Sequence, residues 1–220
     1  YHDHLTIGTR YAFIFSNQNI RKQKSFSYLR IGAEGAGNAM RGAFNIVDKY
    51  RINHAPKKNL PSKDNSYLID SIPFSQFLRF DFDYRYYKIV NATDKIVYRV
   101  AFGLGKTPSK LNVLPLEKSF FAGGPNGIRA WQARTLGPGG DTTAHTIADK
   151  IGDSKIEGNI EYRFHIIKLL NAALFVDAGN VWLHNPYKNY PLKEFDIHSF
   201  IGQIAIGAGV GIRLDFNFFI

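Results

Sequence analysis

The chain has 220 residues and a formal net charge of +10, and 45% of its residues are apolar and 15% aromatic. This apolar content is too high for a disordered chain. The sequence contains no cysteine, which excludes disulfide frameworks, thiolate metal sites and a cysteine nucleophile. No apolar run approaches the roughly 18 residues of a membrane helix, so a helical membrane protein is also excluded. The positive charge alone does not separate nucleic-acid binding from binding to an anionic surface or from basic loops.

An alternation of apolar and polar residues with a period of two dominates the sequence and is typical of β-strands. The clearest example is 79–86, where four aromatic residues alternate with two arginines and two aspartates. Seven segments show this pattern: 5–15, 26–33, 79–86, 96–105, 155–165, 172–182 and 203–216. Most of them are close to the roughly 9–11 residues that a tilted strand needs to cross a bilayer.

The connections between these segments alternate in length. Short connections fall near 16–25, 89–95 and 166–170, and long ones at 34–75, 106–153 and 184–201. Short periplasmic turns and long external loops are regular features of outer-membrane barrels. A soluble antiparallel sheet is the alternative, but nothing requires such a sheet to place every long connection at one end. We therefore predict an all-β fold, an antiparallel transmembrane β-barrel with long external loops.

The alternation also predicts which face of each strand meets lipid. One face carries the residues expected to contact hydrocarbon: Phe80, Phe82, Tyr84, Ile160, Tyr162, Ile206 and Val210. The other carries residues expected to face the lumen: Arg79, Asp81, Asp83, Glu157 and Arg213. Within the long connection 34–75, the spacing of Met40, Phe44 and Val47 predicts a short helix over 38–50. An interdomain linker is the alternative for 34–75, but the same strand pattern resumes after it.

The sequence offers no pattern typical of a catalytic, metal or cofactor site. None of the seven histidines forms an i, i+4 pair typical of zinc sites. The glycine-rich segments 123–125 and 137–140 lack the preceding strand, following helix and Lys-Ser/Thr of a phosphate loop. No serine lies in a nucleophile elbow. We therefore predict no enzyme activity, no metal and no cofactor, and the scattered basic residues argue against nucleic-acid binding.

Three ordered motifs carry a family resemblance. They read FFAGGPNGIRAW followed by RTLGPG (120–139), NIEYRF (159–164) and ALFVDAGNVW (173–182), with a closing strand at 209–216. Together they resemble the carboxy-terminal barrel of the BamA/TamA outer-membrane assembly-factor superfamily, also called the bacterial surface antigen family. The resemblance covers about 117–216 and is only architectural before that.

The resemblance implies a sixteen-stranded barrel preceded by POTRA domains, of which residues 1–220 would form the carboxy-terminal part. The POTRA domains and the final two strands would lie outside this chain, because its strands match the eighth to fourteenth. The loop at about 106–153 would be the sixth external loop, folded back into the lumen. A chain that begins with Tyr1, without a signal peptide, is expected to be a mature product or a fragment.

The implied function is non-enzymatic assembly or insertion of proteins in the bacterial outer membrane. The implied partners are nascent outer-membrane proteins, the lipid bilayer and accessory assembly lipoproteins, with no nucleic acid. The alternatives are the barrel of an outer-membrane lipase or other enzyme fusion, and a two-partner secretion transporter. A soluble β-rich binding module is a third reading.

The resemblance also points to particular residues. The lumen-loop motif comprises Gly127, Ile128, Arg129, Ala130 and Trp131, and the strand motif comprises Phe175, Asp177 and Gly179. In the family the loop arginine pairs with acidic residues on two strands, which correspond here to Asp177 and Glu161. Both positions lie on the predicted polar face, so their carboxylates are available to a guanidinium in the lumen.

Two features of the glycines add further expectations. The family motif has glycine where this chain has Ala130, so we expect the tight turn to be shifted to Gly127 or reshaped. Five glycines on the polar face either mark bulges or leave room for the inserted loop, and we favour the second reading. They are Gly103, Gly105, Gly207, Gly209 and Gly211.

Overall fold

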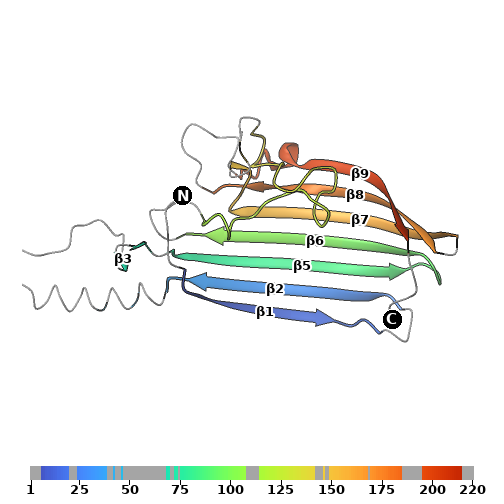
Figure 1. The fold of residues 1–220 in the computed structure, drawn as a ribbon, viewed down its shortest axis with the longest axis horizontal. Coiled ribbons are helices and arrows are strands. Elements are labelled where there is room, and N and C mark those ends of the chain that lie inside the picture. The colour runs from blue at the N-terminus through green and yellow to red at the C-terminus, as the bar shows by residue number, and fades with distance from the viewer. Residues whose placement is uncertain are drawn as a thin grey trace, which may run out of the picture.

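A computed structural model describes residues 6–19, 24–38, 42, 46, 68–69, 72–73, 75–107, 114–141, 146, 149–167, 169–184 and 195–214. Seven strands form one antiparallel sheet in the order β1-β2-β5-β6-β7-β8-β9 (Figure 1). Their bounds are β1 Gly8–Ser16, β2 Phe26–Ala36, β5 Phe77–Ile89, β6 Lys95–Lys106, β7 Ser154–Ile167, β8 Leu170–Trp182 and β9 Ala205–Leu214. Every pairing in this sheet joins strands that follow one another in this order, without a crossover.

The predicted all-β, antiparallel fold is confirmed, and each of the seven predicted segments overlaps one of these strands. The sequence pattern did not predict a second, two-stranded sheet formed by β3 (Leu68–Ile69) and β4 (Ile72–Pro73). Strands of two residues are too short to show an alternation. The helix expected over 38–50 lies almost entirely outside the described residues. Among the residues that are described, no helix is long and apolar enough to cross a membrane.

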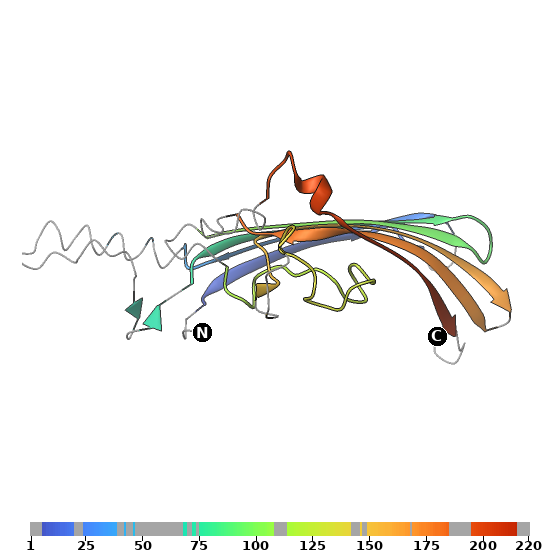
Figure 2. The ribbon, with the colours of Figure 1, turned by 90° about the horizontal axis from the view of Figure 1, so that it is seen from above.

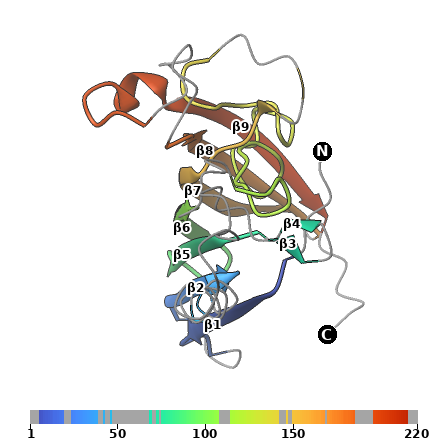
Figure 3. The ribbon, with the colours of Figure 1, turned by 90° about the vertical axis from the view of Figure 1, so that its left-hand side faces the viewer.

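The sheet is curved, and the chain between β6 and β7 lies against its concave face (Figures 2 and 3). The long connections 37–76, 107–153 and 183–204 all leave the same end of the sheet, and the short ones leave the opposite end (Figure 1). The 3-10 helix η4 (Phe200–Gln203), in the last long connection, lies on the convex side (Figure 2). This arrangement brings the β6–β7 connection onto the polar face of the strands.

The other face of the sheet exposes a nearly continuous apolar surface. The register aligns the apolar side chains of neighbouring strands on this face. Ile160 of β7, for example, lies between Tyr98 of β6 and Val176 of β8. The large apolar side chains that this face exposes include Tyr11, Phe13, Phe15, Leu78, Phe80, Tyr84, Tyr98, Val100, Phe102, Leu104, Ile160, Tyr162, Leu174, Val176, Ile206, Val210 and Ile212. An apolar surface of this extent is typical of a face that contacts hydrocarbon.

Labels on this face should be reached by quenchers dissolved in lipid. We expect lipid-soluble quenchers to act on labels at Phe80, Ile160 and Val210 and to leave labels at Asp81 and Glu157 unaffected. An Ile160→Arg substitution should cost about 2–4 kcal/mol if the residue lies near the bilayer midplane. Protection of the first set combined with quenching of the second would reverse the assignment of the two faces.

Candidate functional site

The connection between β6 and β7 is tied to itself at two places. Phe120 and Gly152 form an isolated bridge in which each backbone N–H donates to the other's carbonyl at 2.9 Å. A second bridge joins Ala122 and Leu136. The first bridge separates the ends of the connection from an inner loop, which runs between Phe120 and Gly152. This inner loop carries the motif predicted from sequence.

Apolar packing fixes the inner loop to the wall of the sheet. Ile128 and Ala122 are fully buried, and they pack with Phe120 and with Val181 of β8. Trp131 and Leu136 add partly buried surface to the same cluster. Burial of each of the larger apolar side chains stabilises this packing by about 1.5–3 kcal/mol, which is enough to hold a loop against a strand.

Three of the five glycines on the polar face make this approach possible. A Cβ atom on Gly103 would lie 2.3 Å from the Phe120 ring, and one on Gly207 would lie 2.4 Å from the Ala130 Cβ. A Cβ on Gly105 would lie 2.2 Å from Leu114. For these three, the expectation that glycine leaves room for the loop agrees with the structure.

The other two glycines have different surroundings. A Cβ on Gly209 would meet the ring of Phe175, a residue of the neighbouring strand β8, at 2.5 Å. A Cβ on Gly211 would be in ordinary contact with Ala173, at 3.9 Å. Gly209 therefore accommodates a strand side chain rather than the loop.

Arg129 lies in a turn that is closed by a hydrogen bond between its near neighbours in the chain. The backbone N–H of Trp131 donates to the carbonyl of Ile128 at 3.2 Å, which closes a turn across Arg129 and Ala130. Neither Ala130 nor Gly127 has a positive φ angle, so the turn has not shifted to Gly127. Gly127 is small for another reason, since a Cβ there would lie 2.7 Å from Oε1 of Glu157.

Arg129 contacts both carboxylates with which the resemblance grouped it. Its Nε and Nη2 donate to the two oxygens of Asp177 at 2.8 and 2.7 Å, and its backbone N–H donates to the same carboxylate at 3.0 Å. Nη1 donates to Glu161. The guanidinium lies 3.6 Å from the centroid of the Phe175 ring. The Asp177 side chain is 0% exposed, Glu161 8% and Arg129 21%, so little water competes for these bonds.

Asn159 is a member of the site that the sequence analysis did not single out. Its Nδ2 donates to the backbone carbonyl of Gly127 and to Oδ1 of Asp177, both at 2.8 Å. It therefore joins β7, β8 and the loop at one point. Its position on the polar face was visible in the alternation, but its partner depends on the register between strands.

Glu161 is shared by three arginines from three elements. Besides Arg129, it accepts hydrogen bonds from Arg163 of β7 at 2.6 Å and from Arg213 of β9 at 2.8 Å. One carboxylate thus links the loop, its own strand and the strand at the edge of the described sheet.

A second ionic group continues the network toward β5. Arg99 of β6 donates to Asp83 at 2.9 Å, to Glu157 at 3.2 Å and to Asn159 at 2.9 Å. It also donates to the backbone carbonyl of Asn126 at 3.0 Å. The loop is therefore bonded to β6, β7 and β8 through polar side chains.

A third group of contacts joins two of the long connections. Asn180 of β8 donates to the carbonyls of Gly139 and Gln203 at 2.8 and 2.6 Å. Trp182 Nε1 donates to the Gln203 side chain at 2.6 Å. The end of β8 therefore holds the inner loop and the η4 segment together.

Asp153 lies where the β6–β7 connection enters β7, and it is buried. Its backbone carbonyl accepts from the N–H of Gly105, and its own N–H donates to Trp182. Burial raises the pKa of its carboxyl group, against the opposing effect of the backbone N–H groups of His184 and Leu114, which donate to it. This residue fixes the entry of the loop to both neighbouring strands.

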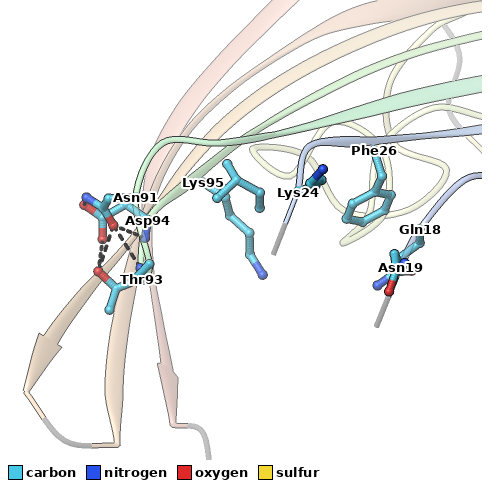
Figure 4. Close-up of a pocket in the computed structure, with 10 residues that line it drawn as sticks. Gln18, Asn19, Lys24, Phe26, Asn91, Thr93, Asp94 and Lys95 are labelled. Atoms are coloured by element: carbon cyan, nitrogen blue, oxygen red, sulfur yellow. Dashed lines mark hydrogen bonds between the residues drawn. The ribbon is translucent and has the colours of Figure 1, made fainter. Parts of the chain in front are cut away.

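At the opposite end of the sheet, Asp94 organises the short β5–β6 connection (Figure 4). It accepts hydrogen bonds from the side chains of Asn91 at 2.9 Å and Thr93 at 3.0 Å, and from Tyr162 of β7 at 3.2 Å. The hydrogen bond from the Asn91 side chain is the main reason that the pKa of Asp94 lies below its ordinary value. The turn borders a hollow of about 220 Å³ on the side of the β1–β2 connection.

The arrangement as a whole is a brace, in which buried carboxylates hold a loop through directional bonds. Within the described ranges, no three His, Asp or Glu side chains come together as a metal site. The role that these contacts support is to fix the position of the loop. They place the loop at a defined position on the concave face, over strands β6, β7 and β8.

Comparison with known proteins agrees with this architecture. Residues 72–219 match the Omp85 superfamily domain. Among solved structures, the chain is similar to BamA from Haemophilus ducreyi lacking POTRA domains 1–3, with a TM-score of 0.50 and 13% sequence identity. The match covers 96% of this chain and 48% of that one, so the chain spans about half the length of the BamA chain. At this identity the similarity concerns the fold alone, which is the antiparallel arrangement of the strands.

Proposed function

This chain belongs to the Omp85 superfamily, and we propose that it forms part of a barrel that assembles or inserts proteins in the bacterial outer membrane. The proposed function is non-enzymatic and of the BamA/TamA type. The barrel would act on nascent outer-membrane proteins within the lipid bilayer, together with accessory assembly lipoproteins. In the complete protein, residues 1–220 would lie within a sixteen-stranded barrel that follows POTRA domains.

The observation that carries this proposal is the loop brace on the concave face. Arg129 joins a loop to two carboxylates of adjacent strands, and one of these carboxylates is fully buried. Burying these charged groups costs desolvation energy, which offsets much of the stability that their pairing provides. We therefore infer that the ion pairs serve mainly to fix the position of the loop. A loop held at one height in the lumen would keep the barrel wall in a fixed shape while strands at another part of the barrel open to a substrate.

Reconstitution of the full-length protein tests the proposal. Vesicles that contain it should fold a urea-denatured outer-membrane barrel faster than protein-free vesicles of the same lipids, as followed by heat-modifiable migration. Equal rates would contradict the proposed function. Two further measurements on the same vesicles separate the alternatives, because lipid hydrolysis would indicate an enzyme fusion and translocation of a soluble passenger would indicate a secretion transporter.

A further inference from the structure

A small pocket lies under the tip of the inner loop, on the concave face of the sheet. It encloses about 160 Å³ between strands β5, β6, β7 and β9 and the loop residues Pro125, Asn126, Gly127 and Arg129. Five arginines line it: Arg85, Arg99, Arg129, Arg163 and Arg213. Glu161 is the one carboxylate among the residues that line it. Its walls are therefore mainly hydrogen-bond donors that carry positive charge.

The ion pairs around the pocket do not balance in charge. Within the described residues, the connected network has four carboxylates, those of Asp83, Glu157, Glu161 and Asp177. It has six cations, namely Arg85, Arg99, Arg129, Lys155, Arg163 and Arg213. One excess cation belongs to the group around Asp83 and Glu157. The other belongs to the group around Asp177 and Glu161, in which three guanidinium groups share Glu161.

Three of the lining arginines offer exposure, spare hydrogen-bond donors or both. The side chains of Arg85 and Arg213 are 41% and 48% exposed. Among the described contacts, Arg213 donates one hydrogen bond, from Nη2, and Arg163 donates one, from Nε. A guanidinium has five N–H groups, so Arg163 and Arg213 can donate to a further acceptor without breaking their bonds to Glu161.

The volume limits the ligand. Pockets for drug-sized molecules enclose about 300–1,000 Å³, so this pocket suits a single charged group and not a large organic molecule. Planar guanidinium forks match the oxygens of carboxylate and phosphate groups. The ligand chemistry that fits is thus one oxyanionic group with two or more oxygens.

We propose that this pocket is an anion-binding site that takes a carboxylate or phosphate group from the lumen, held by Arg85, Arg163 and Arg213. The excess positive charge provides the attraction, and the guanidinium donors provide the direction of the bonds. Anion binding is measured on the purified protein without a substrate protein. Its presence or absence therefore does not depend on the insertion function proposed above.

Calorimetric titration of the full-length protein in an uncharged detergent at low salt tests the site. One sample receives inorganic phosphate and another a tetraglutamate peptide, which distinguishes the two sources of the oxyanion. Either ligand should bind with a stoichiometry of one and should weaken as ionic strength rises, because screening reduces the attraction. Absence of binding by both ligands overturns the proposal.

Substitution then locates the binding. Arg85→Gln with Arg213→Gln should weaken binding at least tenfold, since each removes a charged hydrogen bond. Neither residue contacts Arg129, and Arg85→Gln alone serves if the double variant does not fold. Arg10→Gln is the control matched to Arg85→Gln, because each removes one positive charge. Arg10 lies on the polar face outside the pocket, since its register partner on β2 is Glu34, whose own register partner on β5 is Arg79. Equal weakening by the control means that binding follows net charge alone, and the site is then wrong.

Discussion

Replacing Arg129 with alanine is expected to lower the free energy of unfolding of the barrel by about 3 kcal/mol. Removing one partner of a buried ion pair costs about 3–5 kcal/mol, and the partial exposure of Arg129 places the effect at the lower end. The cost arises because Asp177 is left fully buried, with Asn159 as its remaining side-chain donor among the described residues. Unfolding in urea, followed by heat-modifiable migration, measures the loss.

A second substitution identifies the cause of that loss. Asp177→Asn in the Arg129→Ala background should recover part of the lost stability, because it removes the unpaired charge. Glu161→Gln in the same background is the control and should recover less, since Glu161 keeps Arg163 and Arg213. Strictly additive losses for Arg129 and Asp177 would mean that the loop is held by Ile128 and Trp131 packing alone.

Replacing Gly179 with alanine is expected to cost about 3 kcal/mol or more, or to prevent folding. A Cβ at this position would lie 2.2 Å from the backbone carbonyl oxygen of Ile156 and 2.9 Å from the Cα of Glu157. Both atoms belong to the backbone of the paired strand β7, so no side chain can move aside. Overpacking against a fixed backbone exceeds the usual cost of an extra methyl group. The yield of folded barrel and its urea midpoint measure the effect.

Gly158→Ala provides the matched control for this prediction. Gly158 lies in the paired strand, opposite Ala178, and no atom lies within 4 Å of the Cβ that the substitution would add. Alanine is favoured over glycine inside a strand by roughly 0.5–1 kcal/mol, so the control should be neutral or slightly stabilising. Similar losses at the two positions would show that the close approach of β7 and β8 is not the cause.

The strands of the main sheet could be predicted because each meets two different environments. Residues 79–86 alternate between an apolar face and a charged face, and a period of two follows directly from the geometry of a strand. The strands β3 and β4 could not be predicted in this way, since two residues carry no period. The ends of the strands were also imprecise: β5 extends to Ile89 and β2 to Ala36, where alternation gives way to loop contacts.

The residues of the candidate site were likewise predicted only in part. The pairing of Arg129 with Asp177 and Glu161 followed from a family motif and from the side of the strand on which each residue lies. Asn159 and Arg99 were missed because their partners are determined by register, and a single sequence does not specify how far two strands are offset. Gly209 was assigned to the wrong neighbour for that reason, since the Phe175 ring reaches it from the next strand.

The bridge between Phe120 and Gly152 has a consequence for chain entropy. It brings the two ends of the inner loop together, so the entropy cost of closing the inner loop does not depend on the length of the segment between β6 and Phe120. Loop-closure entropy rises by only about 0.6 kcal/mol for each doubling of length. We therefore expect insertions between β6 and Leu114 to leave Arg129 at the same position in the lumen, because Leu114 packs at Gly105 and the bridge at Phe120 fixes the ends of the inner loop.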